Sequence, residues 1–241
     1  MNVPQLSIVI PAKNEADSLV DVVNEIAAEL AGQSFEIVVV DDGSTDATGA
    51  VLRTLAGQYA NLRHIAHDES CGKSAAILSG VRMARGDMIC TLDGDGQNDP
   101  RAILGLLALA SEPGVALAAG QRVKHAHSSL KRIGSKFANG LRSRMLRDRT
   151  RDTACGLKAF RRDVFLRLPY FDTMHRFLPA LVLREGFEVR HLDVIDRPRR
   201  HGESKYGVLD RALTGALDLM GVRWLVGRRK SVPQVAEITA K

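Results

Sequence analysis

The sequence predicts an α/β protein with a doubly wound, mostly parallel sheet, helices on both faces and C-terminal amphipathic helices. Short runs that are apolar throughout alternate with longer segments whose apolar residues recur at helical spacing. Polar and glycine-rich clusters follow these runs, at the strand ends where such sheets bind ligands. The 241 residues are 45% hydrophobic and 26% charged, which excludes disordered, collagen-like and disulfide-scaffold proteins.

The elements follow one another in strict alternation. The first strand is expected at residues 6–10, where Pro11 ends it, and a helix at residues 14–30 with Asn14 as its N-cap. Four further strands are expected at residues 35–40, 62–66, 88–92 and 115–119, and three further helices at about 45–55, 71–84 and 100–110.

Four polar clusters fall on one predicted rim: residues 11–15, Asp41 with Asp42, Gly72 with Lys73, and residues 93–99. Turn chemistry explains any one of them but explains four together poorly. No G-x-G-x-x-G follows the first strand. A P-loop needs a glycine five residues before Gly72, and that position is His67, so both phosphate-binding motifs are excluded.

The pair Asp93 and Asp95 follows the predicted fourth strand and is separated by one glycine. Two such carboxylates can converge on one hard cation, and Gln97 adds an amide oxygen, so the set suits Mg²⁺ or Mn²⁺. The same pattern is common in simple turns, and the spacing alone leaves both interpretations open.

Charge is distributed unevenly along the chain. Residues 1–120 carry a net charge of −9 and residues 121–241 a net charge of +15. This polarity suggests a polyanionic partner, although a solvated helix face is the ordinary alternative. Aromatic residues make up only 5%, so a stacking platform for nucleic acid is not expected.

Cysteines and hydropathy bear on the compartment. The three cysteines are odd in number and in no ligand pattern, which is typical of reduced thiols in a cytosolic protein. No segment is apolar over a length that would span a bilayer. Early charges and the lack of a small-residue cleavage site do not fit a signal peptide.

Three motifs in this order resemble the family-2 glycosyltransferases: IVIPAKNE at residues 8–15, VDDGSTD at 40–46, and GD at 86–87 leading to DGDGQ at 93–97. The closest resemblance is to the polyprenyl-phosphate branch, typified by dolichyl-phosphate mannose synthase, over roughly residues 5–210. It implies a GT-A fold over residues 1–205, followed by an amphipathic segment at 206–241. The order of the motifs is specific, whereas each motif alone is not.

The resemblance implies roles for the strand-end residues. Asp42 matches the acid that reads the nucleotide base, and Asp95 with Gln97 would hold the metal, with Asp93 against the ribose or diphosphate. The residues implied to bind the nucleotide are Pro11, Glu15, Asp41, Asp42, Gly72, Lys73 and Asp93; those implied to hold the metal are Asp93, Asp95 and Gln97.

The second half adds basic segments. Arg122 follows the fifth strand, where the family places a phosphate-contacting arginine, and residues 152–160 resemble the segment that completes the sheet. Residues 131–139 and 199–206 resemble the basic helix and the late basic loop. The implied acceptor-phosphate residues are Arg122, Lys131, Arg132, Ser135, Arg200, Ser204 and Lys205; the implied catalytic residues are Asp95, Arg122, Arg200 and Lys205.

The function implied is metal-dependent, inverting transfer of a sugar from a UDP- or GDP-linked donor to a polyprenyl phosphate. A phosphate monoester is largely anionic at neutral pH, so it needs little general-base help. His175 is either a base or a satisfied helix-end residue, and His201 is the best histidine candidate because it lies in the late basic loop.

Residues 206–226 predict an amphipathic helix. Its apolar stripe contains Leu217, Met220 and Trp224, with Asp218 opposite and a basic cluster at 228–230. This pattern is typical of an interfacial anchor, and equally of a helix packed on the domain's own core. The anchor interpretation implies a peripheral protein on the cytoplasmic face of the membrane; a homo-oligomer is also compatible with the sequence.

Two other functions remain open at this stage. One is a family-2 transferase that acts on a sugar hydroxyl of a polysaccharide or glycolipid, which would need a base carboxylate over the donor sugar. The other is a nucleotide- or RNA-binding module without catalysis, supported by the basic half and opposed by the intact D-x-D motif.

Overall fold

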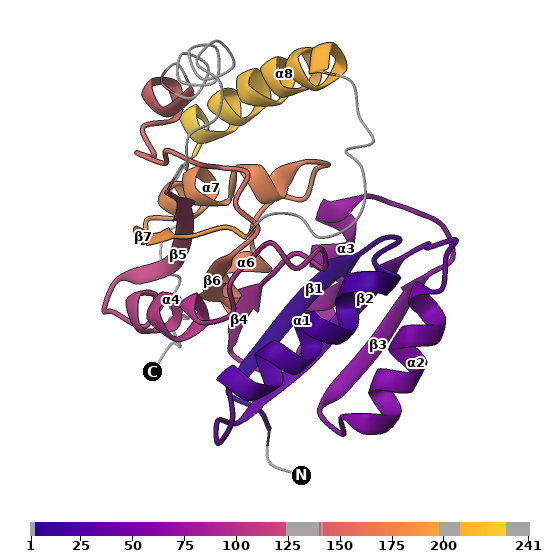
Figure 1. Cartoon of the computed structure of the whole chain (residues 1–241). Coiled ribbons are helices and arrows are strands. Elements are labelled where there is room, and N and C mark those ends of the chain that lie inside the picture. The colour runs from indigo at the N-terminus through magenta and orange to yellow at the C-terminus, as the bar shows by residue number, and fades with distance from the viewer. Residues whose placement is uncertain (1–2, 124–139, 141, 198–207, 230–241) are drawn as a thin grey trace, which may run out of the picture.

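The computed structural model describes residues 3–123, 140, 142–197 and 208–229, with the backbone alone over 208–214. At its centre is a seven-stranded sheet in the order β3-β2-β1-β4-β6-β5-β7 (Figure 1). All pairs are parallel except those of β6, which runs antiparallel to both β4 and β5. The strands are β1 (Leu6–Ala12), β2 (Phe35–Asp42), β3 (Leu62–His67), β4 (Met88–Thr91), β5 (Val115–Arg122), β6 (Lys158–Arg161) and β7 (Glu188–Val194).

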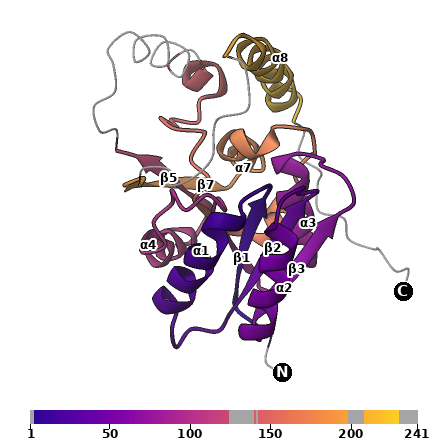
Figure 2. The same cartoon turned by 45° about the vertical axis from the view of Figure 1, so that its right-hand side comes forward.

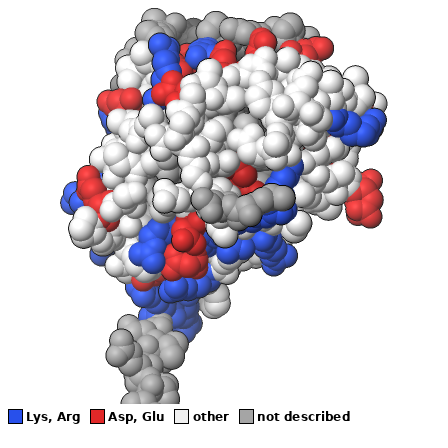
Figure 3. All heavy atoms as spheres, turned by 90° about the horizontal axis from the view of Figure 1, so that it is seen from below, with Lys and Arg blue, Asp and Glu red and all other residues white. Residues whose placement is uncertain are grey.

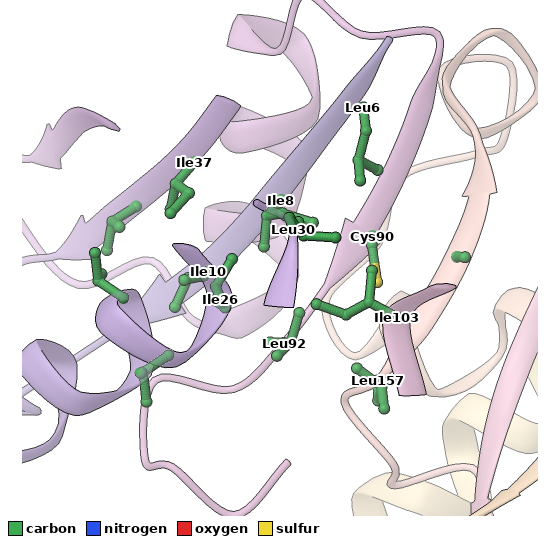
Figure 4. Packing of buried hydrophobic residues seen from close by; sticks show 14 of the residues in the cluster. Leu6, Ile8, Ile10, Ile26, Leu30, Ile37, Cys90, Leu92, Ile103 and Leu157 are labelled. Carbon is green, nitrogen blue, oxygen red and sulfur yellow. The ribbon is translucent and has the colours of Figure 1, made fainter. Parts of the chain in front are cut away.

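Helices cover both faces of the sheet, as predicted. Because side chains alternate along a strand, Ile8 and Ile10 pack with α1, α2 and α4, whereas Val9 packs with α3 and α7 on the other face. Figure 4 shows the first of these clusters. The helices are α1 (Ala16–Glu29), α2 (Thr48–Gln58), α3 (Lys73–Met83), α4 (Ala102–Ala110), α6 (Arg162–Phe165), α7 (Leu178–Arg184) and α8 (Val208–Gly227), with a 3-10 turn η1 (Met174–Arg176).

The expected strands and helices are present with shifts of a few residues at their ends. The prediction that Asn14 caps α1 is wrong. Glu15 is the residue before the helix, and its own side chain makes no capping hydrogen bond. Asn14 instead adopts a left-handed backbone with φ of 56°, and its side-chain oxygen accepts from the Thr45 N–H at 2.8 Å. Asparagine tolerates this conformation, so it ties the β1–α1 loop to the loop after β2.

Helix α8 packs through the side opposite to its predicted apolar stripe. Val222 is buried, and Asp218 accepts a hydrogen bond from the Thr173 hydroxyl at 2.6 Å. Leu217, Met220 and Trp224 remain 58%, 57% and 62% exposed. The alternative that the helix packs on the domain's own core therefore holds for α8, but through Val222 and its neighbours rather than through these three residues of the stripe. In Figures 1 and 2, α8 crosses the end of the molecule that lies farthest from the N-terminus. Strand β1 runs toward this same end.

The face of the molecule seen in Figure 3 shows mixed charge. On the face in Figure 3, acidic and basic side chains lie beside one another rather than in separate fields. Ion pairs such as Arg63 with Glu36 and Arg190 with Glu112 account for many basic groups among the described residues. The basic excess is carried by two stretches, 122–151 and 197–205. The structure does not describe residues 124–139 and 198–207, which make up most of these stretches.

Candidate active site

The predicted rim exists because parallel pairing aligns the carboxyl ends of neighbouring strands. Ala12 at the end of β1 pairs with Asp41 of β2, and Asp42 pairs with His67 of β3. Strand β4 lies on the other side of β1 and leads directly into the turn that carries Asp93. The topology therefore brings four sequence clusters to one edge, as predicted.

Asp93 is held from three directions. Its carboxylate accepts from the Lys73 amine at 2.5 Å, and its backbone N–H donates to the Asn98 side-chain oxygen at 3.0 Å. A Cβ added to Gly156 would lie only 2.2 Å from the Asp93 carboxylate oxygen, so this carboxylate rests on bare backbone. The Gly156 carbonyl in turn accepts from the Thr91 hydroxyl at 2.6 Å.

The turn itself is built against the first helix. The Gly94 carbonyl accepts from the Ser18 hydroxyl at 2.6 Å. A Cβ at Gly94 would lie 3.5 Å from the Pro11 carbonyl oxygen and 3.6 Å from Glu15 Cγ, so these two predicted pocket residues adjoin the D-x-D turn. Asp95 is only 7% exposed, and its carboxylate accepts from the Gln97 N–H at 3.1 Å.

Gln97 connects the turn to the segment after β7. The Arg197 N–H donates to the Gln97 carbonyl at 2.9 Å, and the Gln97 side-chain nitrogen lies 3.5 Å from the Arg197 carbonyl. The Arg197 guanidinium pairs with Glu25 and Asp99. These contacts fix where the chain enters residues 198–207. The donor set of Asp93, Asp95 and Gln97 consists of oxygens, which is the chemistry that Mg²⁺ and Mn²⁺ require.

Asp42 organises the loop that precedes α3. One carboxylate oxygen accepts from His67 Nδ1 at 2.8 Å and the Cys71 N–H at 2.9 Å; the other accepts from the Ser70 hydroxyl at 2.8 Å and the Gly72 N–H at 2.9 Å. Burial raises the pKa of this carboxyl, but these donors outweigh burial and lower it overall. Four donors match the acceptor capacity of a carboxylate.

Asp41 lies beside Asp42 and is also engaged within the fold. Its carboxylate accepts from the Ser44 N–H at 2.9 Å, and its second oxygen lies 3.9 Å from His64 Nε2. Gly43, between these loops, has φ of 62°, and a Cβ there would lie 2.7 Å from the Ser70 nitrogen. Only glycine therefore lets the loop after β3 pack on the end of β2.

Arg122 at the end of β5 lies between two carboxylates. Its guanidinium donates to both oxygens of Asp152 at 2.6 and 2.9 Å, and to Asp196 at 3.2 Å. Burial raises the pKa of Asp152, and the Arg122 guanidinium more than reverses this. For Asp196 burial prevails and the pKa is raised. Asn98 donates to Asp196 at 3.3 Å, so this network reaches the residue that holds Asp93.

Two buried bases lie behind the Lys73–Asp93 pair. Burial lowers the pKa of the Lys158 amine to about 8, and its ammonium donates to the Cys155 carbonyl. His175 Nδ1 lies 2.7 Å from the Ser74 hydroxyl. Burial, together with the neighbouring Lys73 and Lys158 charges, holds the pKa of His175 well below its usual range. His175 is thus a satisfied, neutral histidine in this arrangement.

Sequence comparison identifies the family. Residues 7–168 match the family described as glycosyl transferase family 2. The chain is 34% identical over 235 residues, 95% of its length, to the dodecaprenyl-phosphate galacturonate synthase of Rhizobium johnstonii.

The chain belongs to glycosyl transferase family 2.

A second relative of this transferase is the undecaprenyl-phosphate 4-deoxy-4-formamido-L-arabinose transferase of Edwardsiella ictaluri, 33% identical over 85% of the chain. The chain spans 69% of the length of the Rhizobium protein and 63% of the Edwardsiella protein. Family membership confirms the resemblance inferred from the three motifs. It places this chain among glycosyltransferases rather than among nucleotide- or RNA-binding modules without catalysis.

Solved structures confirm the GT-A fold of this transferase. The mannosyl-3-phosphoglycerate synthase of Rubrobacter xylanophilus superposes with a TM-score of 0.74 at 20% identity, covering 96% of this chain and 77% of the other. A mannosyltransferase from Pyrobaculum calidifontis, solved with GDP-Man and Mn²⁺, gives a TM-score of 0.68 at 20% identity, covering 97% and 67%. At this level of identity the likeness establishes the fold alone.

Several predicted site residues of the transferase lie outside the described ranges. They are the acceptor-phosphate candidates Lys131, Arg132, Ser135, Arg200, Ser204 and Lys205, together with His201. Their roles remain predictions. Among the described helices, none combines the length and apolar content needed to cross a bilayer.

Sequence reasoning missed four residues that shape the site. Asn98 lies within the polar cluster at residues 93–99, but nothing in the sequence assigned it a role of its own. Gly156 and Lys158 lie in the segment already expected to complete the sheet, where the glycine was the available signal. Asp196 had no local signal, because only the parallel pairing of β7 with β5 brings its segment to Arg122.

Proposed function

We propose that this family-2 transferase moves a sugar from a UDP- or GDP-linked donor to a polyprenyl phosphate, with inversion at the anomeric carbon. The observation that carries the proposal is its 34% identity, over 95% of the chain, to a dodecaprenyl-phosphate galacturonate synthase. The Edwardsiella relative is named for transfer to undecaprenyl phosphate. Solved proteins of the same fold carry GDP-Man or UDP-glucose, which supports the donor class.

The donor would occupy the rim formed by the ends of β1, β2 and β4. Pro11, Glu15 and Gly72 form its proposed walls, and Lys73 supplies a cation beside Asp93 for the diphosphate. The Asp42 carboxylate holds the Ser70–Gly72 loop, and the Asp41 carboxylate holds the Ser44 turn. We propose that both residues contribute to base binding mainly by positioning these two backbone segments.

Asp93, Asp95 and Gln97 would hold a divalent cation. The set fits Mg²⁺ or Mn²⁺ because it offers only oxygen donors and lies at a buried strand end. When bound, such an ion neutralises charge that develops on the leaving nucleoside diphosphate. The contacts of Asn98, Gly156 and Ser18 keep the turn in place before the donor arrives, which is the preorganisation that electrostatic catalysis needs.

The acceptor chemistry explains why cations matter more than a base in this proposal. A phosphate monoester has a second pKa near 6 and already attacks as an anion at neutral pH. The neutral His175, held by Ser74, then has no proton to take from the acceptor. Arg122 would contact the acceptor phosphate through its guanidinium edge, or would act indirectly by positioning Asp196 and, through it, Asn98. The basic residues at 131–135 and 200–205 would bind the acceptor phosphate.

We propose further that α8 brings the transferase to the cytoplasmic membrane surface as a peripheral protein. Leu217, Met220 and Trp224 form an exposed apolar stripe, and the Arg228 guanidinium lies 5.9 Å from the centroid of the Trp224 ring. A tryptophan with adjacent arginines is typical of residues that rest among lipid headgroups. The lipid carrier of the proposed reaction would be reached from such a position.

The test is a panel of labelled UDP- and GDP-sugars incubated with the protein, Mg²⁺ or Mn²⁺, and undecaprenyl phosphate. Unphosphorylated undecaprenol serves as the matched acceptor. The proposal expects label in the organic phase with the phosphate and none with the alcohol. Asp95→Asn, which removes one charge from a buried turn, should reduce transfer by about two orders of magnitude or more.

Three outcomes would contradict the proposal. Label that moves to undecaprenol or to a soluble oligosaccharide, but not to the lipid phosphate, would favour a hydroxyl acceptor. Full transfer in the presence of EDTA would remove the cation from the mechanism. Wild-type transfer by Asp95→Asn, with donor and acceptor as proposed, would remove Asp95 from the site.

A further inference from the structure

A second group of metal-ligating side chains lies at the end of β3, apart from the D-x-D turn. Asp42, His67 and Cys71 each offer one donor atom, and the carboxylate oxygen, the imidazole nitrogen and the thiol sulfur all lie within 4.8 Å of one another. The Cys71 thiol now donates to the Glu69 carbonyl at 3.6 Å. The three come from β2, from the last residue of β3 and from the loop before α3. The fold therefore brings together an oxygen, a nitrogen and a sulfur donor from separate segments.

The chemical nature of these donors selects the ion. Zn²⁺ prefers nitrogen and sulfur ligands and accepts a carboxylate, and three protein ligands with one open position are a common arrangement. Mg²⁺ and Mn²⁺ prefer oxygen sets such as that of the D-x-D turn. The two groups of side chains are therefore suited to different ions.

His67 already has the outer contact that an imidazole ligand needs. Its Nε2 lies 2.9 Å from the Ser79 hydroxyl, so Nε2–H can donate to Ser79 while Nδ1 offers its lone pair to a metal. Nδ1 lies 2.8 Å from the Asp42 carboxylate. An ion between these two atoms would replace the proton they now share.

Cys71 is accessible, which distinguishes it from the other two cysteines. Cys90 and Cys155 are buried, whereas Cys71 is exposed. Its N–H donates to Asp42, so the residue is already anchored at the cluster through its backbone. Rotation of one exposed side chain, rather than a change of fold, would shorten the sulfur's distance to the other two donors.

We propose that Asp42 Oδ1, His67 Nδ1 and Cys71 Sγ form a Zn²⁺ site whose fourth position is open to solvent. Binding moves the His67 ring proton from Nδ1 to Nε2 and releases the Cys71 thiol proton to solvent, so the site carries an anionic thiolate, a carboxylate and a neutral imidazole. An ion there would fix the loop that leads into Lys73. The site shares Asp42 and the Ser70–Gly72 loop with the proposed donor pocket, but its test does not use sugar transfer.

The test uses Co²⁺ as a spectroscopic substitute for Zn²⁺, on the full chain without a histidine tag and with excess Mg²⁺ to occupy oxygen sites. The expected result is a thiolate-to-cobalt charge-transfer band that saturates at one ion per chain and is lost when Zn²⁺ is added. Only a cysteine produces this band. Cys71→Ser should abolish it, and His67→Asn should weaken Co²⁺ binding at least tenfold.

Matched variants separate ligation from general damage. His64→Asn alters the neighbouring β3 histidine, which faces Asp41, and should leave the band unchanged. Ser79→Ala removes only the outer contact of His67 and should weaken binding about 10- to 100-fold. As an independent readout, Zn²⁺ should slow alkylation of Cys71 in the wild type and not in His67→Asn, measured by mass spectrometry.

The proposal is overturned by either of two results. One is a wild-type protein that shows no thiolate-to-cobalt band although circular dichroism reports it as folded. The other is a band of unchanged intensity and affinity in folded Cys71→Ser or His67→Asn. Both results would leave the Asp42–His67–Ser79 contacts as a network that holds the loop before α3, and both are measured without sugar transfer.

Discussion

Asp93 takes its position from a residue that has no side chain. Its carboxylate lies against the backbone of Gly156 and also pairs with the Lys73 amine. Thr91 fixes Gly156 through a 2.6 Å hydrogen bond to its carbonyl. Any side chain at position 156 would compete with the carboxylate for the same space, because the added Cβ would lie 2.2 Å from its oxygen.

Gly156→Ala should therefore displace Asp93 and disturb the proposed metal site. A misplacement of about 1 Å at a reacting centre can cost roughly 100-fold in rate. We expect kcat to fall by about that factor and the Mn²⁺ concentration for half-activation to rise. Steady-state kinetics with varied Mn²⁺ at saturating donor measures both quantities.

Gly57→Ala is the control for this substitution. Gly57 lies on an exposed position of α2, with nothing within 4 Å of an added Cβ. It should leave kcat unchanged and raise stability by about 0.5–1 kcal/mol. Equal kinetics for Gly156→Ala and the wild type would show that Asp93 does not depend on this contact.

At this scale, the sequence located the site residues but not their partners. The motif order placed Asp42 and Asp93 at one rim, because strand-end position follows from local pattern. That Asp42 accepts four hydrogen bonds from its own protein depends on the course of the 68–72 loop. Loop paths are set by contacts such as that of Gly43 with Ser70, which no local pattern encodes.

At the level of elements, α3 approaches the sheet through Gly80. A Cβ at this position would lie 2.4 Å from Val9 Cγ1 and 3.2 Å from Val40 Cγ2. Both valines are fully buried, and a β-branched side chain has few rotamers with which to withdraw. The close contact explains how α3 brings Lys73 within reach of Asp93.

Gly80→Ala should thus destabilise the protein by about 1–3 kcal/mol, the usual cost of overpacking a core. Helix propensity alone predicts the opposite sign, since alanine favours helix over glycine by about 1 kcal/mol. Urea denaturation measures the difference, with Gly57→Ala as a helical glycine in open space. A gain in stability for both variants would refute tight packing at Gly80.

Helix α8 gives the second prediction at this scale. If its exposed stripe rests on a membrane, the double variant Leu217→Gln, Trp224→Gln should reduce binding to anionic vesicles about tenfold or more. The variant lacks two large apolar side chains whose transfer from water into the membrane would favour binding. Vesicle flotation measures the bound fraction. Since both residues are exposed, the thermal midpoint should change little.

Val222→Ala is the matched variant on the packed side of α8. It removes buried methyl groups and should lower stability while leaving vesicle binding intact at a temperature where the protein is folded. Vesicle binding that is unchanged by the double variant would reject the membrane proposal for this helix.

Across the whole molecule, the sequence predicted those features of the fold that follow from local hydrophobic periodicity. Alternating strands and helices indicated a parallel, doubly wound sheet, and β2 does pair in parallel with β3. The insertion of β6 between β4 and β5 was not predictable, because β6 follows β5 by more than thirty residues and pairs antiparallel with both neighbours. Only the family resemblance indicated that the segment at 152–160 completes the sheet.

Stability should respond to acid in two stages, because buried groups of two kinds have shifted pKa values. Burial lowers the pKa of His64, His175 and His191 in the folded protein. As the pH falls through about 6.5, the unfolded chain binds protons that these histidines do not, so stability decreases. Asp42 and Asp152 have lowered pKa values, because hydrogen bonds to Asp42 and the Arg122 guanidinium beside Asp152 outweigh the effect of burial. Their contribution to the free energy of unfolding is therefore lost only below about pH 4.

The share of the first stage that comes from His175 can be measured with one substitution. Each histidine that stays neutral in the folded state adds up to about 1.4 kcal/mol per pH unit to the loss of stability below 6.5. His175→Gln keeps a hydrogen-bonding group near Ser74 but removes the titration, so its stability should decrease less steeply between about pH 6.5 and 5. Urea unfolding at several pH values gives both slopes. If the slopes are equal, His175 is protonated at the same pH in the folded and unfolded chains, and its burial among Lys73 and Lys158 has no energetic consequence.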